Sequence, residues 1–88
     1  MRPRPTIDAE ALALSALATT LTDERRAQRF LDLSGIDTDE LRRRAAEPAL
    51  LAALISFLEA HEPDLIDVAE AIAVSPQELV DARRDLEQ

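Results

Sequence analysis

Apolar residues recur along the chain at spacings of three and four, with polar residues between them. The first such series predicts a helix over about residues 8–20. The buried face of this helix is expected to be Ile7, Ala11, Leu14, Ala18 and Leu21. A second series begins after Thr22, a candidate N-cap, with Asp23 and Glu24 in the first turn, where the helix dipole favours acids. Its expected buried residues are Ala27, Phe30 and Leu31, with Leu33 as a further candidate.

Capping residues predict where the second helix ends and the third begins. Gly35 is the only glycine of the chain, and it follows the second apolar series directly. Glycine adopts the left-handed conformation that closes many helices, so Gly35 is predicted to end this one. Asp37 then precedes Glu40 at the spacing of a capping box, which predicts a short helix over about residues 38–46. Leu41 and Ala45 are its expected buried residues.

Three prolines predict the starts of the remaining helices. Proline is favoured at the first helical position and disfavours helix in the residue before it. Pro48, Pro63 and Pro76 therefore predict helices over about residues 48–61, 63–73 and 76–86, the last of them preceded by a Ser75/Glu78 capping box. The 48–61 segment is apolar around more than half of its circumference, so it is the predicted central helix. The expected buried residues of the three are Leu50, Leu51, Leu54, Ile55, Phe57, Leu58, Leu65, Ile66, Ala69, Ile72, Leu79, Val80 and Leu86.

These elements predict an all-α fold, a compact single-domain bundle of five to six short helices. Residues 1–7 hold two prolines and two arginines and are expected to form a flexible N-terminal arm, with residues 8–88 as the helical domain. The chain is 47% hydrophobic, which suits a folded core, and aromatic residues make up only 2%, which disfavours a β fold.

One set of motif residues resembles a known family. It comprises Arg29-Phe30-Leu31, Ser34-Gly35-Ile36, Leu41-Arg42, Pro48, Leu51, Leu54, Phe57-Leu58 and Glu62. Over about residues 9–86 the chain resembles domain-of-unknown-function family 3572, a family of small bacterial proteins. The sequence departs from the family pattern at Val68, where an aromatic residue is expected, and at Ala73, where glycine is expected. The resemblance implies a small helical protein without an established activity.

The composition argues against several kinds of chemistry. Without cysteine the chain has no disulfide, no thiol nucleophile and no Cys-ligated metal. His61 is the only histidine, and no serine lies in a nucleophile motif. We therefore expect no enzyme activity, no cofactor and no metal site. No apolar run approaches the roughly 20 residues that span a bilayer. Asp8 and Glu10 argue against a signal peptide, so a cytoplasmic protein is expected.

The formal charge of −8 is unevenly distributed. Residues 1–44 hold eight arginines and eight acids, whereas residues 45–88 hold two arginines and ten acids. The segment 65–86 is typical of a helix-turn-helix, which suggests a DNA-binding regulator as an alternative function. Because DNA affinity depends on neutralising phosphates, the acidic half makes nucleic acid an unfavourable partner.

The favoured interpretation is a protein-interaction module with an unknown protein partner, a second copy of the chain among the candidates. An acidic surface would attract a partner of opposite charge. The candidate partner-binding acids are Glu59, Glu62, Asp64, Asp67 and Glu70. The second candidate cluster is basic and consists of Arg42, Arg43 and Arg44. His61, among the acids, is interpreted as complementing a helix C-terminus rather than as a metal ligand.

Overall fold

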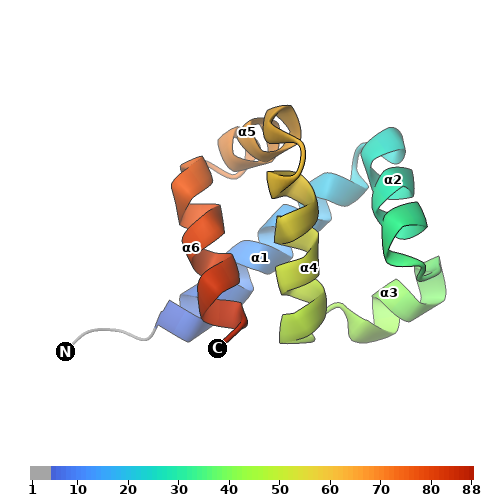
Figure 1. Ribbon diagram of the computed structural model, residues 1–88, viewed down its shortest axis with the longest axis horizontal. Helices are drawn as coiled ribbons and strands as arrows, with labels where there is room; N and C mark the ends of the chain where they lie inside the picture. The colour runs from blue at the N-terminus through green and yellow to red at the C-terminus, as the bar shows by residue number, and fades with distance from the viewer. Residues whose placement is uncertain (1–4) are drawn as a thin grey trace.

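The computed structural model describes residues 5–88, and the side chains from Ala9 onward. Over those residues the chain forms six α-helices and no strand (Figure 1), which confirms the predicted all-α bundle. The helices are α1 (Pro5–Leu21), α2 (Glu24–Ser34), α3 (Thr38–Arg44), α4 (Pro48–Glu59), α5 (Glu62–Ala71) and α6 (Pro76–Leu86). The part of the predicted N-terminal arm over residues 1–4 lies outside the described residues.

Helix α4 lies in the middle of the molecule, between α6 on one side and the pair α2 and α3 on the other (Figure 1). Helices α1, α4, α5 and α6 pack together into one body. Helices α2 and α3 form an arm at the far end of α1, which we call the α2–α3 arm (residues 24–44). The described chain measures 40 × 26 × 18 Å, so the arm makes the molecule elongated.

The core centres on α4, as predicted. Six of its twelve residues are buried, namely Leu50, Leu51, Ala52, Leu54, Ile55 and Leu58. Leu79, Ala82 and Leu86 of α6 join the same cluster of buried side chains, together with Leu65, Val68 and Ala69 of α5. The α2–α3 arm adds only Phe30 and Leu41 to this cluster.

Most of the predicted caps are present. Gly35 has φ 77° and ends α2, and its N–H donates to the Leu31 carbonyl. The Asp37 carboxylate accepts from the Glu40 N–H at 2.8 Å, and Ser75 forms a complete capping box with Glu78. The N-cap of α2 is Asp23 rather than Thr22. The Thr22 hydroxyl donates to the Thr19 carbonyl instead, so the carboxylate one residue later serves the first turn.

Helix bounds differ from the prediction at several ends. Helix α1 begins at Pro5, three residues before the expected start, and α5 begins at Glu62. Three helices end two residues early, at Arg44, Glu59 and Ala71. After α4 and α5 the chain turns through hydrogen bonds that span three residues instead of the four of an α-helix, such as the bond from His61 N–H to the Leu58 carbonyl.

The predicted buried face of α1 is wrong. Leu14 and Leu21 are 40% and 41% exposed, and the buried residues are Ala9, Ala13, Ala16, Leu17 and Thr20. Helix α1 is apolar on most of its circumference, so spacing alone does not select its buried side. The small alanines allow the close helix approach that packing against α4 and α6 requires. Ile7 has no described side chain, and two other expected core residues, Leu33 and Ile66, are exposed.

Candidate functional site

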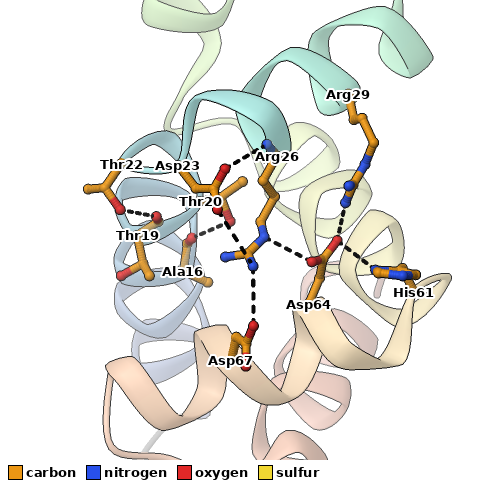
Figure 2. A network of polar contacts seen from close by, with 10 residues as sticks. All are labelled: Ala16, Thr19, Thr20, Thr22, Asp23, Arg26, Arg29, His61, Asp64 and Asp67. Atoms are coloured by element: carbon orange, nitrogen blue, oxygen red, sulfur yellow. Dashed lines mark hydrogen bonds and ion pairs between the residues drawn. The ribbon is translucent and has the colours of Figure 1, made fainter.

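The Asp64 carboxylate joins α5 to α2 through two arginines of α2 and also contacts His61, which directly precedes α5 (Figure 2). Asp64 lies in the first turn of α5 and is only 5% exposed. Arg26 Nε donates to Asp64 Oδ1 at 3.0 Å, and Arg29 Nη2 donates to Oδ2. His61 Nδ1 lies 3.0 Å from the same Oδ2. Asp64 therefore anchors the α2–α3 arm to the body of the molecule.

The surroundings of Asp64 lower its pKa below the usual value. Burial by itself raises this pKa, because it disfavours the charged form. The hydrogen bond with His61 and the positive charges of Arg26 and Arg29 lower it by more. Asp64 is accordingly ionised at neutral pH, and its charge is compensated inside the structure.

The five acids of the predicted partner-binding surface have different surroundings. Asp64 is buried, and Glu59 pairs with Arg83 of α6. Asp67 lies 3.4 Å from Arg26 Nη2. Glu62 and Glu70 are exposed on α5. The fold thus brings arginines from distant segments onto three of these acids, which no helical spacing could reveal.

The arginine triplet of α3 is also partly engaged. Arg44 bonds Glu40 at 3.0 Å and Glu47 at 2.9 Å, and the bonds to Glu47 and Glu40 raise its pKa. Arg42 lies 3.9 Å from Asp39, and Arg43 is exposed. The triplet therefore offers Arg42 and Arg43 to solvent, while Arg44 links the end of α3 to the start of α4.

A groove of about 590 Å³ runs between α2 and α4. Sequence reasoning did not predict it, because it depends on how the α2–α3 arm stands against α4. Its lining is mostly apolar and includes Phe30, Leu33, Ala53, Ser56, Phe57 and Ala60. Arg29 and His61, both bonded to Asp64, also line it. The Asp64 network and this groove therefore adjoin and form one candidate site.

The two phenylalanines of the protein meet at this groove. The rings of Phe30 and Phe57 are 5.4 Å apart at 62°, an edge-to-face arrangement. The Arg29 guanidinium lies 5.6 Å from the centre of the Phe57 ring, within the range of a cation–π contact. Leu33 lines the groove and is 78% exposed. The groove thus combines an aromatic contact with an exposed aliphatic side chain.

The family model for DUF3572, a protein of unknown function, matches residues 6–88. This chain belongs to that family. The match confirms the resemblance carried by the motif around Gly35 and extends it to the last residue of the chain. No curated protein matches this DUF3572 chain, and no solved structure does.

This DUF3572 chain departs from the family pattern at Val68 and Ala73, and the structure shows the surroundings of both residues. Val68 is fully buried in α5. Ala73 has φ 62°, the left-handed conformation that glycine adopts most readily. The N–H of Val74 donates to the Ala69 carbonyl at 2.9 Å, and that of Ala73 to the Glu70 carbonyl at 3.1 Å. This pair of bonds is the Schellman motif, so a glycine at position 73 would serve the end of α5.

The helix-turn-helix-like segment of the DUF3572 chain corresponds to α5 and α6. Arg83 is bonded to Glu59 and Glu87, and Arg84 lies 3.9 Å from Asp81. Both arginines of α6 are therefore close to carboxylates.

Among the side chains that the structure describes, from Ala9 onward, no group of three or more His, Asp and Glu is placed to hold a metal ion. No helix in that part of the chain has both the length and the apolar character needed to cross a membrane.

Proposed function

We propose that this protein is a non-enzymatic protein-interaction module that takes an apolar helical segment into the groove between α2 and α4. The groove itself carries the proposal: it is concave, mostly apolar and lined by Leu33, which is 78% exposed. Exposed apolar surface of this kind is typical of binding sites, because its removal from water favours association.

A helix suits this groove better than an extended strand. The walls are two helices, and an amphipathic helix laid between them could complete a three-helix packing. Only Phe30 is fully buried on α2, although Ala27 and Leu31 are half-buried. A partner side chain next to Leu33 and Phe57 would give the arm the apolar contacts that it lacks by itself.

Two matched variants, each with glutamate in place of an exposed alanine, test this proposal. Ala53 lines the groove and Ala18 lies on α1, and both are exposed. We expect Ala53→Glu to lose the proteins that wild type captures by crosslinking in a cell lysate, because a buried unpaired charge opposes binding. Ala18→Glu adds the same charge and should retain them. Equal capture by the Ala53→Glu variant would contradict the groove as the binding surface.

The exposed acids of α5 support a second contact with a partner. Glu62, Ile66 and Glu70 follow one another at spacings of four, so they share one face of the helix. Ile66 is 46% exposed between the two carboxylates. This stripe suits a partner with basic residues, chiefly by raising the association rate. The double variant Glu62→Gln/Glu70→Gln should slow association and weaken its salt dependence, and it leaves the buried Asp64 intact.

DNA binding through residues 65–86 has less support. The pairing of α5 and α6 by a short turn favours it, but α6 exposes Glu78 and Asp81, and the exposed Glu87 follows directly. Arg83 is paired with Glu59, and Arg84 lies 3.9 Å from Asp81. Few positive charges of α6 are therefore available to neutralise phosphates. A labelled duplex should show no mobility change with the protein at low salt. A change in the mobility of the duplex would instead favour a DNA-binding regulator.

A further inference from the structure

We infer that the helical segment taken up by the groove belongs to a second copy of this chain. Two copies pack groove to groove about a twofold axis, and each places Leu33 in the groove of the other. This inference rests on the proposed function of the groove and names its occupant. It also assigns Leu33 as the side chain that provides the specific apolar contact.

The groove surface has the self-complementarity that a twofold interface requires. In such an interface the same patch serves both copies, so it must contain both a protruding group and a hollow that accepts it. Leu33 is the most exposed large apolar side chain of the described residues, at 78%. It borders the hollow formed by Ala53, Phe57 and Ala60. A leucine and a hollow with small and aromatic walls therefore lie in one patch.

Charge also favours this side of the molecule for contact between copies. Residues 24–59, from α2 through α4, hold six arginines and seven acids, a net charge of −1. Residues 62–88, which form α5 and α6, hold two arginines and eight acids, a net charge of −6. Two copies that met through α5 and α6 would bring like charges together. The residues given as the groove's lining include no acid, so contact through it does not place lining carboxylates against one another.

Removal of Leu33 from water by both copies supplies a substantial part of the association free energy. Each dimer would bury two such side chains, and a single leucine accounts for about tenfold or more in an equilibrium constant. Leu33 lies in the last turn of α2 and is largely free of the monomer's own core, so its replacement leaves the fold of the single chain in place.

Sedimentation equilibrium over about 1 μM to about 1 mM tests the inference. Wild type should approach twice the chain mass of 9.7 kDa as concentration rises. Leu33→Glu should weaken the dimer by about 100-fold or more. Leu14→Glu makes the same chemical change at an exposed leucine on α1 and should leave the dimer unchanged. Circular dichroism of both variants checks that the helices persist.

A cysteine crosslink provides an independent measurement, because the natural chain contains no cysteine. Chains carrying Leu33→Cys and Ala53→Cys, mixed and oxidised, should form a covalent heterodimer more readily than chains carrying Leu33→Cys and Ala18→Cys. Equal crosslinking of the two mixtures would overturn the twofold arrangement.

Three results of the sedimentation experiment would overturn the inference: a monomer at every concentration, a dimer unaffected by Leu33→Glu, or open-ended assemblies. The wild-type chain could also be a monomer at every concentration and still capture lysate proteins that the Ala53→Glu variant loses. In that case the groove would bind another protein, and only the second copy as its occupant would be excluded.

Discussion

Ala73 and Gly35 have the same backbone conformation with different side chains. Both have positive φ, 62° and 77°, at the end of a helix. An L-residue in this conformation is disfavoured by roughly 1–2 kcal/mol, because its Cβ approaches the following carbonyl oxygen. Both helix ends therefore suit glycine. The end of α2 has glycine at this position, whereas the end of α5 has alanine.

Ala73→Gly should raise the free energy of unfolding by about 1 kcal/mol, and Gly35→Ala should lower it by a similar amount. Ala73 is exposed, so its methyl group contributes little packing. A Cβ at Gly35 would meet no atom within 4 Å, so backbone strain alone sets the cost. Urea denaturation of both variants measures the two changes. A decrease in stability for Ala73→Gly would show that the left-handed conformation is not strained here.

Asp64 is the side chain whose charge holds the α2–α3 arm. Asp64→Asn keeps the shape of the side chain and removes its negative charge. We expect a loss of about 2 kcal/mol in the free energy of unfolding at pH 7, less than a fully buried pair would lose because Arg29 is partly exposed. Glu62→Gln, on an exposed acid of the same helix, serves as the control and should change stability far less.

The lowered pKa of Asp64 makes its contribution depend on pH. The pKa of Asp64 is lower in the folded chain than in the unfolded chain. In the unfolded chain an Asp has a pKa of about 3.9. The unfolded state therefore binds the proton first as the pH falls. The stabilisation is complete above about pH 5 and disappears as the pH drops through the folded-state pKa. The stability difference between wild type and Asp64→Asn should shrink over that range, and a constant difference would contradict this origin.

At the scale of whole helices, the six elements differ in how much of each is buried. Six of the twelve residues of α4 are buried, against one of eleven in α2 and one of seven in α3. Local opening needs less free energy where few apolar contacts are broken. The α2–α3 arm is thus held by Phe30, Leu41 and the ion pairs to Asp64.

Hydrogen exchange followed residue by residue should show the slowest amides in α4 and the fastest helical amides in α3. In the Asp64→Asn variant the amides of α2 and α3 should exchange faster, while those of α6 change little. Equal acceleration in all six helices would mean that Asp64 supports the whole fold rather than the arm.

Caps and faces differed in how far the sequence predicted them. Gly35, Asp37 and Ser75 were identified correctly because caps depend on neighbours within a few residues. The buried face of α1 was not, since a helix with apolar residues on most sides can bury several of them. Alanines such as Ala13 and Ala16 are buried there, while the larger Leu14 is exposed. The groove was missed for a related reason: Leu33 continues the apolar series of α2, yet the arm stands away from the body.

For the whole molecule, the net charge of −8 opposes the approach of two copies. A dimer through the apolar groove should therefore tighten as salt rises from about 0.05 M to about 0.5 M, because salt screens this repulsion and leaves apolar contacts in place. A dimer between the acids of α5 and the exposed arginines of α3 should weaken over the same range. Sedimentation equilibrium at the two salt concentrations distinguishes them, and weakening would exclude the groove dimer.

The sequence by itself determined the helical class, the number of helices to within one, most of their caps and the central position of α4. These features depend on local propensity and on apolar spacing within single segments. Only the tertiary structure decided that Asp64 is a buried partner of Arg26 and Arg29, and that α2 and α4 border an apolar groove. Arg26 and Asp64 are 38 positions apart. No local pattern relates residues at such a distance, because their contact depends on how separately formed helices pack.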